Sequence, residues 1–196
     1  MGVEVYLLHW LQSGTLDLGL GGLAVAVARW AIWIGVLGAV ALFVLAPRSA
    51  EGLRRAAFYG LVAGVLALLL AHSLAGAFVR PRPPVEAGAL VKALGPLPTS
   101  SSFPARAGAF LFGLAGGLWA GGEDAAMLAV LWGLLAAVAE MAAGLAFPTD
   151  EVGGVLLGLS TGWAVLLARG LFERPLRGLL RYGGWGSSNP RHRSDR

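Results

Sequence analysis

Long apolar runs alternate with short polar or proline-rich stretches along the chain. Five such runs are present, at residues 23–46, 56–79, 104–119, 125–146 and 151–168. A helix needs about 20 mostly apolar residues to cross a hydrocarbon core of about 30 Å, and most of the runs approach that length. The pattern predicts an all-α fold, a polytopic membrane helix bundle with about five transmembrane helices.

The chain begins with a shorter helical segment, residues 3–12, which at about 1.5 Å per residue cannot span a membrane. Tyr6, His9 and Trp10 give this segment amphipathic rings, which are typical of the boundary between lipid and water. We therefore expect an N-terminal interfacial helix in front of the bundle.

Composition indicates one membrane domain and a separate tail. Of the 196 residues, 57% are hydrophobic and 13% are charged, and the mean hydropathy is +0.71, as in integral membrane proteins. We expect a single membrane domain over residues 1–182. Residues 183–196 are rich in Gly, Ser and Arg without apolar periodicity, and should form a basic, disordered cytoplasmic tail. The absence of cysteine excludes disulfides and thiolate metal ligands, and we expect no metal and no cofactor.

The charge pattern predicts orientation and partners. The net charge of +4 comes largely from the C-terminal arginines, which are Arg174, Arg177, Arg181, Arg191, Arg193 and Arg196. Such a region is more typical of a cytoplasmic end beside anionic lipid than of a nucleic-acid site, so we expect membrane lipids and no nucleic acid as partners. Arg48, Arg54 and Arg55 against the single acid Glu51 make the first connection basic as well. In the cell membrane, five spans then leave the C-terminus cytoplasmic.

Three polar stretches break the apolar pattern, and the count of spans puts all of them on the non-cytoplasmic side. They are residues 73–83, 100–107 and 139–150. Arg80, Arg82 and Arg106 suit an anionic phosphate head group, because guanidinium groups pair well with phosphate oxygens. Hydroxyl groups that accompany them come from Ser100, Ser101 and Ser102. The arginines are equally well interpreted as interfacial anchors that touch lipid phosphates without specificity.

Glu140 lies inside the fourth predicted span, where a carboxylate costs about 2.5–3.5 kcal/mol and needs a partner or a polar cavity. Its candidate partners are Arg106, Arg80 and His72. A structural ion pair or a protonated acid is at least as good an interpretation as a catalytic role. Asp150 opens the fifth span, where a helix cap is the default interpretation and catalysis the weaker one. His72 and Ser73 are expected to face the bundle interior in a structural or coupling role.

Two predicted spans carry glycines at intervals of four residues, which lets a neighbouring helix approach closely. These glycines are Gly60 and Gly64 in one span and Gly154, Gly158 and Gly162 in the other. The sequence leaves open whether they pack within the chain, in a homo-oligomer or against a partner membrane protein.

The polar stretches resemble the three motifs of the type 2 phosphatidic acid phosphatase family of membrane lipid phosphatases, which includes undecaprenyl pyrophosphate phosphatase-like enzymes. The family pattern is Lys, six residues and Arg-Pro; then Pro-Ser-Gly-His; then Ser-Arg, five residues, His, three residues and Asp. The chain matches it at Arg80, Pro81, Phe103, Pro104 and residues 147–150. It departs from it at Ser73, Ala105, Arg106, Ala107, Ala139, Glu140 and Ala146.

The resemblance implies a helical bundle with a phosphate site, but the groups that do the family's chemistry are missing. In that family the third-motif histidine attacks phosphorus and the second-motif histidine protonates the leaving group. These positions are Ala146 and Ala107 here, so the chain resembles a degenerate member without both histidines. Asp150 matches the aspartate that orients the nucleophile. Arg106 and Glu140 replace Gly and Arg, which predicts an ion pair across the bundle.

Two main hypotheses of function follow, and they leave open whether the chain is an enzyme. The first is a non-catalytic pseudo-enzyme that binds or transports an anionic, phosphate-headed lipid such as a polyprenyl phosphate. The alternative is a phosphatase on polyprenyl pyrophosphate or phosphatidic acid, with Glu140 or Asp150 as a non-standard general base. A transporter coupled to protons or ions, with Glu140 as the titrating group, is a third hypothesis.

Overall fold

The computed structural model describes residues 2–47, 49–119 and 123–182, and every regular element in these ranges is helical. The elements in chain order are α1 Val3–Asp17, α2 Gly21–Leu45, α3 Glu51–Ala77, α4 Pro83–Glu86, the 3-10 helix η1 Gly88–Leu90, α5 Arg106–Leu118, α6 Glu123–Ala142, α7 Pro148–Leu167 and α8 Arg169–Tyr182. The expected all-α fold is therefore confirmed. The predicted tail, 183–196, lies outside the described residues.

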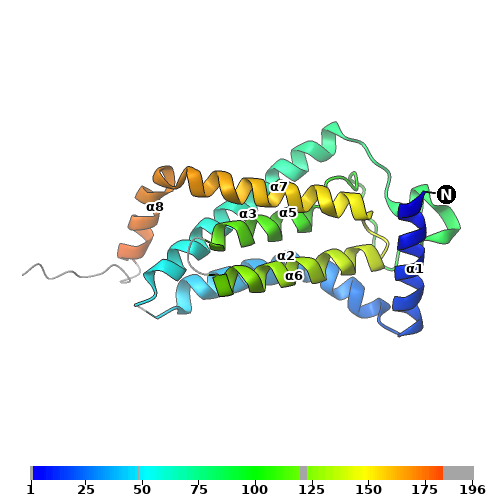
Figure 1. Cartoon of the computed structure of the whole chain (residues 1–196), viewed down its shortest axis with the longest axis horizontal. Helices are drawn as coiled ribbons and strands as arrows, with labels where there is room; N and C mark the ends of the chain where they lie inside the picture. The colour runs from blue at the N-terminus through cyan, green and yellow to red at the C-terminus, as the bar shows by residue number, and fades with distance from the viewer. Residues whose placement is uncertain (1, 48, 120–122, 183–196) are drawn as a thin grey trace, which may run out of the picture.

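Four long helices and one short helix form a membrane bundle (Figure 1). Within the described ranges, α2, α3, α6 and α7 are long and apolar enough to cross a membrane. The remaining predicted span is α5, whose 13 residues measure about 20 Å and fall short of a full bilayer core. The four long helices all pack against α5, which makes it the centre of the bundle.

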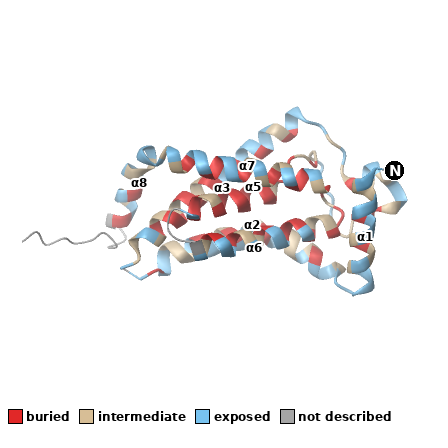
Figure 2. Cartoon of the chain, viewed as in Figure 1, coloured by how far each residue is buried: buried red, intermediate tan, exposed pale blue. Residues whose placement is uncertain are grey.

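Burial follows the pattern expected of a bundle that is surrounded by lipid. Eleven of the 13 residues of α5 are buried, whereas Leu69, Leu131 and Leu156 on three outer helices are exposed. Figure 2 shows this division, with buried residues along the inner faces and exposed ones outside. Since lipid is as apolar as leucine, an outer surface of this kind indicates an integral membrane protein.

Both glycine faces are used inside the chain. A Cβ at Gly117 of α5 would lie 2.5 Å from the Cα of Gly60 on α3, and one at Gly158 of α7 would lie 2.5 Å from the Ala109 carbonyl on α5. The backbones are therefore close enough that only glycine fits. The sequence left open what these faces pack against, and in the described chain their partner is α5.

Several helix boundaries differ from the prediction for identifiable reasons. α6 ends at Ala142 because Gly144 takes a positive φ of 72° and the Leu145 amide donates to the Glu140 carbonyl over 2.9 Å, a glycine-based helix end. Pro104 precedes α5, which begins only at Arg106. α8 was not predicted at all.

The two ends of the bundle carry different short helices. α1 is helical, as expected, but is longer than predicted, and Figure 1 shows it crosswise at one end with α8 at the other. The buried residues Leu176 and Leu180 of α8 pack in one cluster with Tyr59 and Val165. The end that carries α1 is the one that holds the polar stretches.

Candidate functional site

The three polar stretches meet at the α1 end of the bundle. The Ser102 amide donates to the Arg80 carbonyl over 3.1 Å, and the Ala105 amide donates to the Asp150 carbonyl over 3.0 Å. The third link is the Arg82 guanidinium, which donates to the Leu145 carbonyl. Residues that are far apart in sequence thus form one site, as the resemblance of the motifs implied.

Arg80 is held by two carboxylates and one hydroxyl. Its Nη1 lies 2.7 Å from Asp150 Oδ1 and 2.6 Å from Thr149 Oγ1, and its Nη2 lies 2.7 Å from Glu4 Oε2. The guanidinium also lies over the Phe147 ring, 4.3 Å from its centroid. Partial burial alone would lower the pKa of Arg80, but the pairing with Glu4 and Asp150 outweighs it and raises that pKa. Arg80 is therefore permanently charged and fully engaged within the chain.

Asp150 is the buried centre of this cluster and has no free oxygen. Its side chain is 0% exposed, with Oδ1 bound by Arg80 and Oδ2 accepting the Phe147 amide over 2.9 Å. The second contact is the half of a capping box in which the N3 side chain accepts the N-cap amide at the start of α7, since Phe147 has no polar side chain to complete it. This geometry favours the helix-cap interpretation of Asp150 over that of a general base, which needs a free lone pair facing substrate.

Arg82 and Arg106 occupy a different position, at the wall of a small cavity of about 60 Å³. Arg82 is half-buried and its Nε donates to the carbonyls of Pro98 and Ser100, each over 3.2 Å. Arg106 Nη2 donates to Ser100 Oγ over 2.8 Å. Burial lowers the pKa of Arg82 below its ordinary value, and the charge of Arg106 acts in the same direction. Two guanidinium groups at one cavity are a chemical match for an oxyanion.

The other residues that line the cavity include no histidine. Besides the two arginines, the lining residues are Pro98, Ser102, Pro104, Ala105, Glu140, Leu145 and Ala146. The cavity is several times larger than the roughly 10–15 Å³ that one water requires, so it can hold a few waters or one small anion. Ala146, which the motif resemblance aligns with one histidine, is on its wall, while Ala107, which it aligns with the other, is buried in α5. No lining residue is a histidine.

The predicted ion pair between Arg106 and Glu140 is wrong in detail. Both side chains line the cavity, but the ion pairs in the described part of the chain do not include them. The two residues therefore share the cavity without a direct ion pair. Arg106 instead binds Ser100, which lies six positions earlier.

Comparison with known proteins places this geometry in a known fold. No protein-family model and no curated protein matches the chain. The crystal structure of Aquifex aeolicus LpxE matches with a TM-score of 0.59 and 22% sequence identity, over 85% of this chain and 96% of that one. The chain has the fold of LpxE. At this identity the likeness concerns the fold, and the chemistry of the LpxE-like bundle must be argued from the residues present here.

The remaining predicted residues fall into two groups. Ser101 and Ser102 are structural: Ser101 Oγ donates to the Phe78 carbonyl over 2.7 Å and Ser102 Oγ donates to the Pro81 carbonyl over 3.2 Å. His72 and Ser73 are exposed on α3, where Ser73 bonds the Leu69 carbonyl. Among the described residues, no hydrogen bond joins His72 or Ser73 to the cavity, so the expectation that they face the bundle interior is wrong.

α1 supplies site residues that the sequence analysis missed. Glu4 binds Arg80 and also accepts from Thr149 Oγ1 over 2.5 Å, and buried Gln12 donates to the carbonyls of Lys92 and Ala142 over 2.7 and 3.2 Å. Glu4, Leu8 and Gln12 repeat every four residues and so share one helix face. That spacing was the available signal. Glu151 is also missed as a site residue: its position at the start of α7 is typical of a helix cap, but its side chain is buried and interacts with Glu140.

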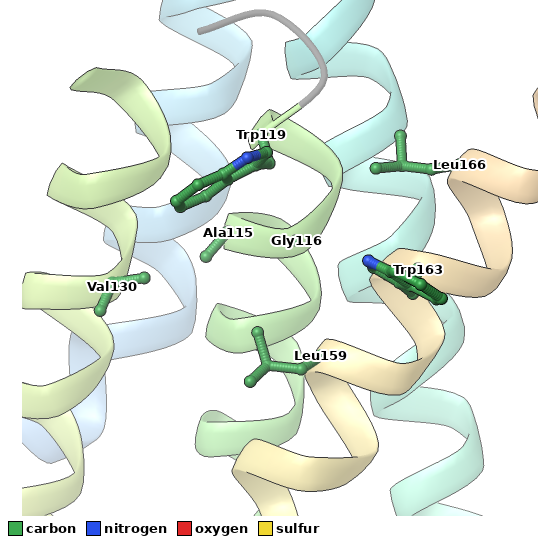
Figure 3. A pocket seen from close by; sticks show the side chains of 7 residues that line it. All are labelled: Ala115, Gly116, Trp119, Val130, Leu159, Trp163 and Leu166. Atoms are coloured by element: carbon green, nitrogen blue, oxygen red, sulfur yellow. The ribbon is translucent and has the colours of Figure 1, made fainter. Parts of the chain in front are cut away.

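A second cavity, of about 330 Å³, lies between α5, α6 and α7 (Figure 3). Trp119, Trp163, Val130 and Leu159 project around it, and none of its lining residues is ionisable. Its chemistry suits apolar chains and no polar reaction. The smaller cavity is lined by three ionisable residues, Arg82, Arg106 and Glu140, and is therefore the candidate functional site.

Proposed function

We propose that this LpxE-like protein binds a lipid with an anionic phosphate head group at the cavity of Arg82 and Arg106. The head group would be held by the two guanidinium groups and by the Ser100 hydroxyl. The proposal further holds that the protein acts as a non-catalytic relative of the lipid phosphatases, because covalent phosphoryl transfer requires a nucleophile. Polyprenyl phosphates and phosphatidic acid are the ligands that this proposal considers.

The observation that carries the proposal is the convergence of two arginines on one cavity whose wall includes Ala146 in place of a histidine. Support also comes from the matching motif residues Arg80 and Pro81 and from the shared LpxE fold. Arg80 is less suited to direct contact, since Glu4 and Asp150 already hold it. The cavity arginines bind mainly carbonyl and hydroxyl oxygens, which leaves their charge uncompensated by a direct ion pair.

The test is lipid binding by purified protein in nanodiscs, measured by native mass spectrometry with phosphatidic acid or undecaprenyl phosphate. Arg82→Ala and Arg106→Ala should each weaken binding by about tenfold or more, as loss of a charge-assisted hydrogen bond of about 1.5–3 kcal/mol implies. Lys92→Ala is the matched control, because Lys92 is an exposed cation at the same end of the bundle. Equal binding by all three variants would refute the proposal.

A lipid phosphatase that uses Glu140 is the second candidate, favoured by the position of Glu140 in the same cavity as both arginines. A carboxylate there could take a proton from a water that attacks bound phosphorus. Phosphate release from the same lipids, measured with wild type and Glu140→Gln, separates the candidates. Release that the substitution abolishes would establish the enzyme, and no release with intact binding would exclude it.

The proposed orientation puts the cavity on the non-cytoplasmic side and α8 on the cytoplasmic side. Its support is the basic connection near Arg54 and Arg55 and the arginines of α8, which follow the positive-inside tendency. Single cysteines at exposed Lys92 and exposed Arg174 would report it in a chain that has no native cysteine. A membrane-impermeant thiol reagent applied from outside the cell should label the first position and spare the second.

A further inference from the structure

Glu151 is a buried acid that the proposed lipid site does not use. It lies on α7, is 4% exposed, and neither of its carboxylate oxygens receives a hydrogen bond from a donor in the described part of the chain. The chain makes room for it at Gly108 of α5, where a Cβ would lie 3.0 Å from Glu151 Oε2. A buried ionised carboxylate without a donor would carry a large desolvation cost, so the group must either carry a proton itself or accept one from a neighbour.

Glu140 of α6 lies on the same side of α5 as this carboxyl: it lines the anion cavity together with Ala105, and Ala105 and Glu151 both adjoin Gly108. Glu140 and Glu151 interact as neighbouring acids. Two carboxylates offer four acceptor oxygens and no donor, and two ionised carboxylates that are neighbours in a buried site repel each other. The pair is bonded only if one of the two carries a proton. The other ionisable groups that face the pair are Asp150 of α7 and, across the cavity, Arg82 and Arg106. Asp150 has both oxygens committed elsewhere and donates nothing.

We propose that Glu140 and Glu151 form a proton-binding site that controls the anion cavity. One proton is shared between the two carboxyl groups, so the pair has a charge of −1 instead of −2 beside the two arginines. The proton comes from water and no covalent bond to carbon changes. This inference rests on the proposed anion binding at Arg82 and Arg106 and adds a condition under which that binding occurs.

The consequence is that anion binding takes up a proton. When the pair loses its proton as the pH rises, a second negative charge lies on the cavity side of the bundle and opposes an incoming phosphate or sulfate. By linkage, affinity then falls by up to about tenfold per pH unit across the range in which the free pair is deprotonated and the complex is not. Glu151→Gln fixes the charge at −1 and supplies a permanent amide donor to Glu140, so it mimics the protonated pair.

The binding test uses sulfate, which remains a dianion between about pH 5 and about pH 9, so only the protein titrates. Calorimetric titration of detergent-purified protein should show wild-type affinity falling as the pH rises. Glu151→Gln should bind at high pH as tightly as wild type at low pH, without a slope. Glu86→Gln, at an exposed acid of α4, should keep the wild-type slope. A flat wild-type profile, or the same slope in Glu151→Gln, would overturn the inference.

A second readout is independent of anion binding. The infrared C=O band of a protonated carboxyl should be present in wild type at neutral pH, absent in Glu140→Gln and in Glu151→Gln, and retained in Glu86→Gln. Its absence from wild type would refute proton sharing. If the band is present but neither sulfate nor phosphatidic acid in nanodiscs binds at any pH, the coupling is wrong and the proposed function fails with it, while proton sharing stands. Binding of sulfate without the lipid would identify a free anion as the ligand.

Discussion

Glu4 of α1 forms an ion pair of 2.7 Å with Arg80, a residue 76 positions later in the chain. The same carboxylate accepts from the hydroxyl of Thr149 over 2.5 Å and from its backbone amide over 3.2 Å, at the first turn of α7. Both side chains of the ion pair are less than one-third exposed. One carboxylate thus fastens α1 to the motif arginine and to a helix N-terminus, where a negative charge is favourable.

Glu4→Gln should loosen α1 without unfolding the bundle. The substitution keeps the shape of the side chain but removes its charge, and loss of a partly exposed charged bond should weaken docking by about 1 kcal/mol. Amide hydrogen exchange should become several-fold faster in α1 and stay unchanged in α5. Glu86→Gln removes an equal charge from the same end and should have no effect, so similar exchange in the two variants would contradict a fastening role for Glu4.

Acid should release α1 in the same way. Partial burial would raise the pKa of Glu4, but hydrogen bonds from Thr149 and Arg80 outweigh it and lower the pKa below its ordinary value of 4.5. A carboxyl with a depressed pKa stabilises the docked state above the pKa of the free group, and that stability is lost as the pH falls through the docked value. The protection of the α1 amides, measured relative to their intrinsic exchange rate, should therefore fall below about pH 4.5 in wild type. In Glu4→Gln this pH dependence should be absent; its persistence would point to another group.

Asp150 should matter more for stability than any other acid of the site with assigned contacts. Asp150→Ala removes the buried partner of Arg80 and the cap of α7 together, which should lower the free energy of unfolding by about 3 kcal/mol. Unfolding in mixed micelles with increasing SDS measures it. Asp17→Ala, at an exposed position at the end of α1, is the control and should change little. A small effect of Asp150→Ala would mean that the cluster contributes little to the fold.

The glycine contacts make a matched pair of predictions possible. Gly117→Ala should destabilise the bundle by about 1–3 kcal/mol, because the new methyl group meets the Gly60 backbone, which has no flexible side chain to move. Gly38→Ala, in α2, adds the same methyl group where no atom lies within 4 Å, and should be neutral or stabilising. SDS unfolding would compare the two, and equal effects would contradict the close approach of α3 and α5.

Apolar periodicity and proline positions were sufficient to predict the helices of the membrane bundle and the meeting of the three motifs. These features depend on local sequence and on the number of times the chain crosses the bundle. The exact ends were not predictable because a single glycine conformation, at Gly144, decides where α6 stops. α8 was missed because its arginines and Pro175 interrupt the apolar run. The helix is amphipathic, and it packs against α3 and α7.

The arginines of the site were predicted, but their partners were not. The sequence did not show that Arg80 pairs with Glu4, because this contact depends on where α1 crosses the bundle. Nor did it show that Glu140 interacts with Glu151, because this depends on the rotation of α6 and α7 about their own axes. Such quantities are set by side-chain packing over the whole chain. Glu151 follows Asp150 at the start of a helix, where acidic residues are common. Only its burial distinguishes it from such a helix-start acid.

Arg82→Lys should behave as a severe substitution although it keeps the charge. The guanidinium of Arg82 donates to the carbonyls of Pro98, Ser100 and Leu145, and so ties the loop before α5 to the turn after α6. A lysine has one compact ammonium group that cannot reach acceptors on both sides at once.

We therefore expect Arg82→Lys to lower the free energy of unfolding by about 1–3 kcal/mol, through unpaired carbonyls, and to increase hydrogen exchange at residues 98–106 and 143–147 together. Arg29→Lys, at an exposed arginine of α2, is the matched control. If Arg82→Lys matched that control in both measurements, Arg82 would be free of the two segments and available to a ligand from the start. Coupled loosening of both segments would instead show that the guanidinium builds the cavity wall before any head group arrives.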